Sequence, residues 1–573
     1  MTEININTER IDDIPLLFGF LQQMGIQETL DAYADSHGNR KGLSIGWLTT
    51  AWLSYIISES DHRMVEVQSW AEKHIETLSA LIPQAVDVKD FTDDRLADLL
   101  QWLSEDMIWE ETENRLSQRL VQVYQLNQEA IRLDSTTASV YHDTEGNTLF
   151  RHGYSKDHRP DLPQIKVMLG TIDPMGMPIS TLVLPGNEAD DGLYIPSIIR
   201  CRQILVQGGH LYVGDAKMSA LDTSGFIQAG GDYYLTPLAQ TGDVPEIMEE
   251  LLKPVWGREQ SLELIYPPED DFEPKAIAVG YETIRSQKTI LANKQKLEWE
   301  ERLVVIYSPS MARKARVGLS QRLDNAEQSI LALTPPKGRG KRQQQDLKVL
   351  ESSVDSILKK YRVEGLIDVS YTCQREERSV RKYKDRPART EKSVRYVVQV
   401  KRNQQAIYEA RRFMGWRLYA TNAPVEKLSL SEAVNMFRGA PRMERNFARL
   451  KGRVLGISPL YVQREDHGCG MVRLLSLALR VLTLVEHVAR KELKSAGETL
   501  SGLYAGNPNR QTAQPTTERL LKAFRYIDLS VVCLPGQTIY HVTPLSELQK
   551  RILFLLGLAP AIYEGLTTFF DSG

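Results

Sequence analysis

The chain has 573 residues, of which 42% are hydrophobic and 25% are charged, and its formal net charge is −4. This length is too great for one core and predicts roughly two to four domains, while the composition excludes a wholly disordered chain. A net charge this close to neutral favours no class of binding partner by itself.

The cysteines are few and far apart, at Cys201, Cys373, Cys469 and Cys533. No pair has zinc-knuckle spacing, and the pattern indicates a reducing compartment rather than a disulfide framework. The N-terminal residues MTEININTERIDD are acidic and polar, so we expect no signal peptide. The most apolar run, residues 471–488, contains Arg473, Arg480 and Glu486, so we interpret it as a buried helix and not as a membrane span.

Residues 1–129 are predicted to be helical. Thr92 and the two aspartates after it are typical of a helix start. Leucines then recur at the spacing of one helix face, at Leu96, Leu99, Leu100 and Leu103. We expect that face to be buried.

Residues 130–137, with the sequence AIRLDSTT, predict a short strand. Apolar Ile131 and Leu133 alternate with Arg132, and two β-branched threonines follow. Asp134 would end the apolar part of this strand. A carboxylate at that position would stand at the end of the strand, where it either starts a turn or is held by the sheet and open to solvent.

Further strands follow this first one. Residues 164–184 predict a hairpin with Pro and Gly in its turn, and a helix is expected after Asp190 or Asp191. Residues 210–214 then predict a buried strand that ends at Asp215. This order of strands and helices is typical of a mixed α/β sheet.

Residues 239–414 differ from the segments on either side, because they combine short strands with many lysines and arginines. Residues 375–395 alone hold nine basic residues against four acidic ones. A charged segment is usually a solvated face, but a local surplus of one sign also suits a phosphate backbone.

Regular elements return after residue 415, with a strand that begins at Trp416 and a helix over residues 443–451. Glu444 and Lys451 are seven residues apart, close to two helical turns, so they share one face of this helix. Basic residues are expected to crowd that carboxylate: Arg438, Arg442, Arg445, Arg449 and Arg453. The remaining residues, 501–573, predict two helical pieces around a short strand.

Three carboxylates form a candidate constellation: Asp134, Asp215 and Glu444. The first and fourth strands of such a sheet can be neighbours, which would bring the aspartates together, and a helix packed across the sheet could supply the glutamate. Clustered carboxylates repel one another unless a hard cation lies between them, and Mg²⁺ or Mn²⁺ suits oxygen ligands. Two such ions about 3.5–4 Å apart can hold the attacking and leaving oxygens of a phosphodiester in line.

Two other patterns point to no site. The group Glu465-Asp466-His467 lacks the spacing of paired histidine ligands, so we interpret it as the cap of the following helix. No GxxxxGK[ST] phosphate loop is present, so the sequence does not imply ATP.

The chain resembles the DDE transposases of bacterial insertion sequences, in the branch whose RNase H-like core is interrupted before the glutamate by a long β-rich insertion. The similar residues are 133–137 (LDSTT), 153–164 (GYSKDHRPDLPQ), 213–217 (VGDAK) and Glu444 with Lys451. The tract 153–164 is the most specific of these, and the similarity spans about residues 130–490.

The branch carries a Tyr-x2-Arg-x3-Glu-x6-Lys signature, which places Glu444 and Lys451 on the last two positions. Phe437 and Ala440 stand where the family has the tyrosine and arginine that hold the end phosphate, and Arg438 or Arg442 is expected to substitute. Trp416 matches a tryptophan that stacks on a flipped base in some members. The alternative for Trp416 is a core residue of its strand.

The resemblance implies an α/β fold with an RNase H-like mixed sheet core. The expected parts are a helical N-terminal domain for DNA-end binding or dimerisation at 1–129, a first core part at 130–238, a β-rich basic insertion at 239–414, a second core part with the glutamate helix at 415–500, and a C-terminal helical region at 501–573.

The implied activity is cut-and-paste transposition by two-metal cleavage of the inverted-repeat ends and joining of the 3′ ends to target DNA. Asp134, Asp215 and Glu444 are the expected ligands of two Mg²⁺ ions, for which Mn²⁺ can substitute. The expected DNA contacts are Lys451, Arg438, Arg442, Arg445, Arg449 and Trp416. We expect a homodimer or higher synaptic assembly at the bacterial nucleoid, in the cytoplasm. A nuclease of this fold without strand transfer and a decayed DNA-binding protein are the alternatives.

Overall fold

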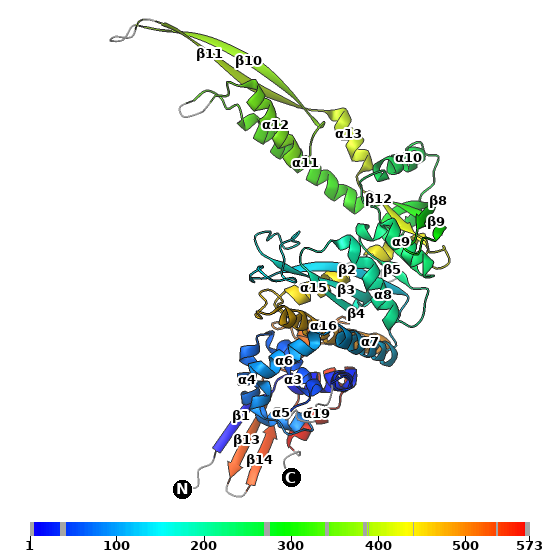
Figure 1. The fold of residues 1–573 in the computed structure, drawn as a ribbon, viewed down its shortest axis with the longest axis vertical. Helices are drawn as coiled ribbons and strands as arrows, with labels where there is room; N and C mark the ends of the chain where they lie inside the picture. Colours follow the sequence, from blue (N-terminus) through cyan, green and yellow to red (C-terminus); the bar gives the residue numbers. More distant parts are fainter. Residues whose placement is uncertain are drawn as a thin grey trace.

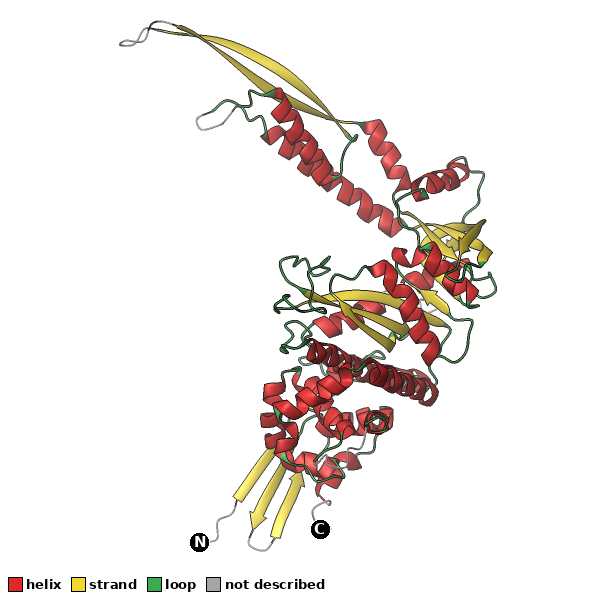
Figure 2. Cartoon of the chain, in the orientation of Figure 1, coloured by secondary structure: helices red, strands yellow, loops and turns green. Residues whose placement is uncertain are grey.

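A computed structural model of the chain describes residues 5–34, 42–268, 275–338, 343–381, 387, 389–438, 441–534 and 537–567. The molecule is long and curved, with a helical unit at one end, a mixed sheet in the middle and an extended arm at the other end (Figure 1). Figure 2 shows strands in the middle, in the arm and beside the chain ends, with helices packed between them. The mixed α/β class expected from the sequence is confirmed.

Within the described residues, nine strands form one sheet in the order β4-β3-β2-β5-β6-β12-β9-β8-β7. The first five are β2 Ala130–Ser139, β3 Gln164–Ile172, β4 Met177–Pro185, β5 Leu211–Val213 and β6 Tyr233–Pro237. β2 pairs antiparallel with β3 and parallel with β5, which in turn pairs parallel with β6. An antiparallel hairpin beside parallel strands is the arrangement expected of the RNase H-like core.

Helices cover this part of the sheet and explain its apolar composition. α8 (Tyr194–Ile204) contacts β3 and β4, α9 (Leu221–Ala229) contacts β6, and α15 (Pro441–Lys451) contacts β2. β3 is buried along its whole length. Strands covered in this way carry nearly continuous hydrophobic runs instead of alternating ones.

The strand that carries Asp134 is longer than the sequence predicted. β2 runs on to Ser139 because its ladder with β3 continues from Ile131 to that residue. Its ladder with β5 covers only Ala130 to Arg132. The expectation that Asp134 ends the strand is therefore wrong, although Asp134 does lie just beyond the last β2–β5 pair.

In the described chain, the first part of the insertion adds three strands to the core sheet, and a later part forms the arm. Its sheet strands are β7 Glu263–Ile265, β8 Ala278–Ile290 and β9 Lys296–Tyr307, and β12 (Trp416–Thr421) joins β9 to β6. The helix α10 (Val244–Trp256) packs beside them.

The arm is built from α11 Pro309–Ala332, α12 Leu347–Tyr361, β10 Ile367–Val380 and β11 Arg389–Arg402, and α13 (Gln404–Phe413) leads back to the sheet. The helix α11 was not expected from the sequence. The arm has its own apolar clusters, which include Leu319, Leu323 and Val363.

The two ends of the chain form one unit. The N-terminal helices are α1 Ile14–Met24, α2 Ile26–Asp31, α3 Ile45–Glu59, α4 Met64–Lys73, α5 Ile75–Leu81, α6 Asp93–Ser104 and α7 Asp106–Val123. Against them lie α17 Thr517–Lys522, α18 Glu547–Leu555, α19 Ala561–Glu564 and a sheet of β1 Asn5–Arg10, β13 Asp528–Leu534 and β14 Gln537–Val542. The leucines predicted to form one face of α6 are fully buried. Strands β1 and β13 were not expected.

The helix α16 (Glu465–Ala496) joins this unit to the core, because it packs on α3 and α6 and also on β4. It is the one helix of the described chain that is long and apolar enough to cross a membrane by composition alone, yet 94% of its apolar window is buried in the protein. The prediction of a buried helix at 471–488 is confirmed. Glu465 in its first turn accepts a hydrogen bond of 2.6 Å from the Thr148 hydroxyl.

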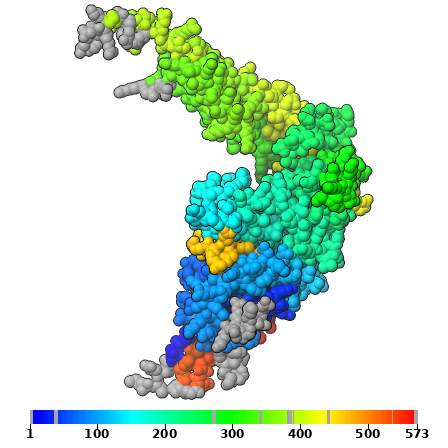
Figure 3. Space-filling view, in the orientation of Figure 1, coloured from blue at the N-terminus to red at the C-terminus, as the bar shows by residue number. Residues whose placement is uncertain are grey.

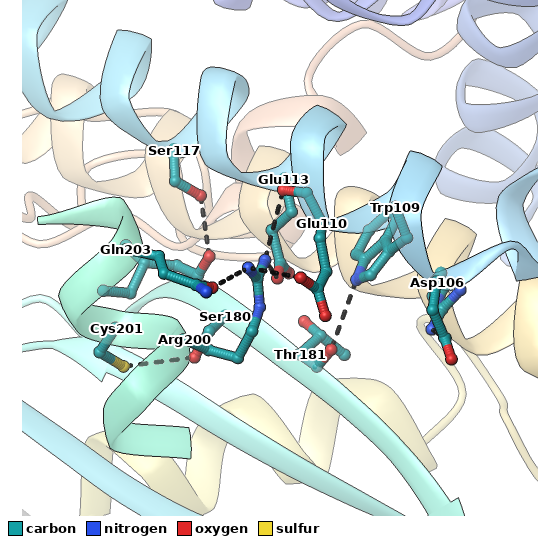
Figure 4. A network of polar contacts seen from close by, with 12 residues as sticks. Asp106, Trp109, Glu110, Glu113, Ser117, Ser180, Thr181, Arg200, Cys201 and Gln203 are labelled. Carbon is teal, nitrogen blue, oxygen red and sulfur yellow. Dashed lines mark hydrogen bonds and ion pairs between the residues drawn. The ribbon is translucent and has the colours of Figure 1, made fainter. Parts of the chain in front are cut away.

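A buried polar network fixes α7, α8 and α16 to the sheet (Figure 4). Glu113 of α7, which is 0% exposed, accepts hydrogen bonds from Arg200 of α8 at 3.1 Å and from Arg480 of α16. Ser117 donates to the Ile179 carbonyl on β4 at 2.8 Å. We call Glu113, Arg200 and Arg480 the buried triad below.

Candidate active site

Asp134 lies on β2 and Asp215 lies two residues beyond the end of β5, at matching positions of two neighbouring segments. In the parallel ladder of β2 and β5, Arg132 is paired with Val213, and each aspartate follows two residues later. The expectation that these two strands are neighbours is confirmed. Asp134 is half-buried and Asp215 is exposed.

The electrostatics of Asp134 reflect this arrangement. The pKa of Asp134 is raised to about 6, mainly by burial and to a smaller extent by the negative charges of Asp215 and Asp190. Lys156 and the Ser135 amide, which donates to Asp134 at 2.8 Å, act in the opposite direction. A bound cation would relieve the same repulsion, so the pair fits a hard metal ion that prefers carboxylate oxygens.

Asp215 is held in place by groups from two elements. The Tyr194 hydroxyl of α8 donates to Asp215 Oδ1 at 2.6 Å, and the Lys217 amide donates to the same oxygen at 2.9 Å. Burial, followed by the charge of Asp215, raises the pKa of Tyr194. Tyr194 therefore remains a hydrogen-bond donor and fixes the orientation of this carboxylate.

The tract at 153–164 folds over the carboxyl-terminal half of β2. Gln164 at its end is buried and donates to the carbonyls of Tyr154 at 3.0 Å and Gly186 at 2.9 Å. Gly153 lies so close to Gly186 that a Cβ would come within 2.4 Å of its carbonyl oxygen, so only glycine fits there. Within the tract, the Lys156 amide donates to Thr137 Oγ1 at 3.0 Å.

The helix α15 brings the predicted glutamate to the same strand. It contacts β2, and Asn446 Nδ2 donates to the Gly176 carbonyl in the β3–β4 turn at 2.6 Å. Lys451 at the end of α15 forms an ion pair with Asp157 of the tract. Glu444 is exposed, and one helix carries both it and Lys451, as predicted.

Two of the arginines expected to crowd Glu444 form ion pairs elsewhere, contrary to expectation. Arg445 and Arg449 both pair with Glu486 of α16, and Arg449 also pairs with Glu518 at 2.8 Å. Arg449 is only 5% exposed. These two side chains turn away because they fill the contact between α15 and α16, which lies on another side of the helix.

The other residues at or beside the signature positions are Phe437, Arg438, Ala440 and Arg442. Arg438 is exposed at the end of α14 (Leu430–Arg438), with Nη2 at 3.4 Å from the Ile277 carbonyl. Ala440 and the side chain of Arg442 lie outside the described residues. Phe437 packs against Tyr419, with ring centroids 4.6 Å apart, so its ring serves the core.

Trp416 is the first residue of β12 and is half-buried. Its ring lies 5.2 Å from that of Tyr307, and it packs against the apolar cluster of Leu252, Val305 and Leu418. These contacts are those of a core residue at the margin of its sheet, and part of the indole stays open to solvent.

Residues that sequence reasoning did not assign to the site lie beside the two aspartates. Asp190 was expected to cap a helix, but it makes ion pairs with Lys166 at 2.6 Å, Lys217 at 3.6 Å and Lys156 at 3.7 Å. The sequence signal for Lys156 was its place in the 153–164 tract, whereas nothing local marks Asp190 or Tyr194.

Asp134 and Asp215 are the candidate metal ligands that the structure brings together. Among the described residues, no three His, Cys, Asp or Glu side chains are close enough together to hold one ion. Asp134 and Asp215 supply oxygen ligands of the right kind, while Glu444 does not complete a group with them here.

A wide hollow separates the arm from the core (Figure 3). The loops that follow β2, coloured cyan, project from the core on the side where this hollow opens (Figures 1 and 3). On the arm, some of the charges are paired, as in Lys392 with Glu377 at 2.9 Å. Lys382, Lys384 and Arg386, from the predicted basic segment, lie outside the described residues.

No protein-family model and no curated protein sequence matches the chain. Among solved structures, the chain is similar to the cryo-EM structure of a piggyBac transposase synaptic complex with hairpin DNA. The identity is 7% and the TM-score is 0.24, over 51% of this chain and 62% of that one. The chain thus spans less than two thirds of that protein's length, and a likeness this distant does not identify its function.

Proposed function

We propose that the protein is a DNA transposase that cleaves the ends of its own element with divalent metal ions and joins the 3′ ends to target DNA. One observation carries this proposal. β2 and β5 are adjacent parallel strands, Asp134 and Asp215 each follow the last pair of their ladder by two residues, and the 153–164 tract, which carries the most specific part of the resemblance, folds over β2.

Asp134 and Asp215 would hold the ions, and Glu444 would complete the ligand set from α15. Mg²⁺ in such a site activates water or a 3′-hydroxyl and stabilises the leaving oxygen. The chain's own residues prepare the carboxylates for this task. Tyr194 and the Lys217 amide fix one oxygen of Asp215, while β3 and the Ser135 amide fix Asp134.

The helix α15 delivers the third carboxylate on a surface that DNA can reach. Its inward side is anchored by Asn446 at the β3–β4 turn and by Arg449 at α16. Its other side carries exposed Glu444 and ends at Lys451, which is tied to the tract through Asp157. In the proposed complex, Glu444 joins the two aspartates once DNA and metal neutralise the carboxylates.

DNA is the substrate that fits this surface. The hollow between arm and core opens beside the loops that follow β2 (Figure 3). Arg438 is exposed at the end of α14, and the arm carries exposed basic residues such as Arg313 and Arg316, where each contact with a phosphate would release counterions. Joining two ends in one event requires at least two copies of the chain in one assembly.

The proposal is tested with Asp134→Asn and Asp215→Asn in the full chain, with a labelled fragment of the element's end and Mg²⁺. Each change keeps the shape of the side chain and removes a negative ligand, so we expect cleavage to fall at least about 100-fold. Binding of the fragment in a mobility-shift assay should stay within about threefold, which is less than 1 kcal/mol. Asp191→Asn is the matched control, because this neighbouring side chain is 68% exposed.

Cleavage at the wild-type rate by either variant would contradict the assignment of the site. A second assay separates transposition from simple nuclease activity. Fragments with pre-cut 3′-hydroxyl ends should be joined to a plasmid by the wild-type protein. A protein that nicks the end but forms no joined product is a nuclease of the same fold, and one that shifts the fragment without nicking it is a DNA-binding protein.

A further inference from the structure

A cluster of opposite charges lies beside the two aspartates, and the reaction as described so far does not use it. Asp190 is at its centre, with Lys156 of the tract, Lys166 of β3 and Lys217 after β5 around it. The Ser135 hydroxyl also donates to Asp190, at 3.2 Å. The cluster therefore joins five segments at the point where β2 and β5 diverge.

The junction of a short helix with α8 contacts both Asp215 and the residue that follows Asp134. Asp190 opens the short helix η2 (Asp190–Leu193), and Tyr194 follows as the first residue of α8. Asp190 reaches Ser135, the residue after Asp134, whereas the Tyr194 hydroxyl reaches Asp215. The η2–α8 junction thus fixes the surroundings of both candidate ligands.

The three lysines differ in how much of their charge remains available. Lys166 is 6% exposed and is satisfied by Asp190 and by the Glu188 carbonyl. Lys156 is 29% exposed and Lys217 is 48% exposed. Because Lys166 already neutralises Asp190 in the interior, Lys156 presents positive charge to solvent, whereas Lys217 also pairs with Asp191 at 3.5 Å.

Lys156 has the more restricted geometry of these two. Its Nζ donates to the Ser135 carbonyl at 2.7 Å and to the Ser135 hydroxyl at 2.9 Å. An ammonium group has three protons to donate, so these bonds leave one for a further acceptor. The group also lies close enough to Asp134 to lower the pKa of that carboxyl.

We propose that Lys156 binds a DNA phosphate oxygen beside the bond that is cut, and that Asp190 is the positioning residue that aims it. This inference rests on the proposed function. A phosphate that approaches Asp134 and Asp215 meets negative charge, and a fixed cation beside them offsets that repulsion. Asp190 holds the lysines from behind, and Lys217 supplies a second cation on the β5 side.

The first test compares cleavage by Lys156→Ala, Lys156→Arg and Asp190→Asn proteins at saturating end DNA. We expect Lys156→Ala to lose about 100-fold in the cleavage rate, as when a preorganised donor is removed, with little change in DNA affinity. Lys156→Arg should recover part of the rate because it keeps the charge. Asp190→Asn should lose about tenfold through misplacement of Lys156.

Lys253→Ala is the matched control, since this lysine on α10 is 63% exposed and makes only a 3.9 Å pair with Glu249. It removes the same charge far from the cluster and should cleave like the wild type. A Lys156→Ala protein that melts like the wild type and also cleaves like it would overturn the proposal.

The second test uses the wild-type protein and needs no cleavage, so it also serves if a variant fails to fold. Lysine acetylation is mapped by mass spectrometry with and without bound end DNA. Lys156 and Lys217 should be protected by DNA, and Lys253 should not. Equal reactivity of Lys156 in both samples would overturn the proposal. Protection of Lys156 in a protein that never cleaves would instead refute the proposed function and leave the phosphate contact standing.

Discussion

The buried triad and the Asp190 cluster use the same chemistry in different surroundings. In each, one carboxylate holds cations from distant segments. Glu113 and Arg480 are both 0% exposed and Arg200 is 6% exposed. In the Asp190 cluster, by contrast, Lys156 and Lys217 retain 29% and 48% of their exposure.

The difference in burial indicates that the buried triad stabilises the fold, whereas the Asp190 cluster can bind a ligand. The guanidinium forks of Arg200 and Arg480 satisfy Glu113 in a dry interior and lock α7, α8 and α16 to the sheet. The ammonium groups near Asp190 are compact, hydrated and open on one side, so they can meet a ligand. Charge alone, which is all that the sequence shows, does not distinguish these two cases.

The largest effect is expected from a change in the buried triad. Glu113→Ala leaves two buried guanidinium groups without their carboxylate, so we expect a loss of about 3–5 kcal/mol in the free energy of unfolding. Thermal and urea unfolding of the full chain measure it. Glu110→Ala is the control, because Glu110 is 47% exposed and lies 3.6 Å from the same Arg200. The control should cost less than about 1 kcal/mol, and equal losses would contradict the role of burial.

Asp13 is a buried carboxylate that has no cationic partner among the described residues. Asp13 accepts a 2.6 Å hydrogen bond from the Ser58 hydroxyl, and burial raises its pKa from 3.8 to about 6. Because the folded pKa lies above the unfolded one, the stabilising contribution of this group is complete below pH 3.8 and is lost as the pH rises through about 6.

The change Asp13→Asn removes this pH dependence. We expect the variant to be more stable than the wild type above pH 6, by up to about 3 kcal/mol, and similar to it in acid. Melting temperatures measured across this range provide the check. A constant difference between the two proteins at every pH would show that Asp13 does not titrate with folding.

The smallest effect is expected for Tyr194, which lies beside the Asp190 cluster. Tyr194→Phe removes one hydroxyl from Asp215, so cleavage should fall about tenfold, which corresponds to about 1.4 kcal/mol, with little change in melting temperature. Tyr234→Phe is matched to it, since that hydroxyl donates to Glu301 over the same 2.6 Å. It should leave cleavage unchanged. Equal losses of cleavage in both variants would show that Tyr194 acts through the fold and not through Asp215.

The sequence predicted those parts of the fold that periodicity controls. The buried leucines of α6, the buried α16, the strand that carries Asp134 and the strand that precedes Asp215 were all expected from local patterns. The neighbourhood of the two aspartates was also predicted, because only a few strand orders are available to such a sheet.

Features that depend on distant partners were missed. β1 has the polar sequence NINTER, with one buried residue, and becomes a strand only because β13 pairs with it. β2 passes Asp134 because β3 continues beside it. The sequence predicted Arg449 as a cation near Glu444, but in the structure it pairs with Glu486 of α16. The sequence likewise predicted Asp190 as a helix cap, but in the structure three lysines from other segments pair with it.

The pairing of β1 with β13 has a consequence for how the protein is made. Asn5 is matched with Cys533, so β1 can pair only after the much later strand β13 has been synthesised. The early helices likewise need α16 to cover them. A chain cut short before residue 528 lacks β13 altogether and cannot close this unit, so premature termination yields no intact amino-terminal half.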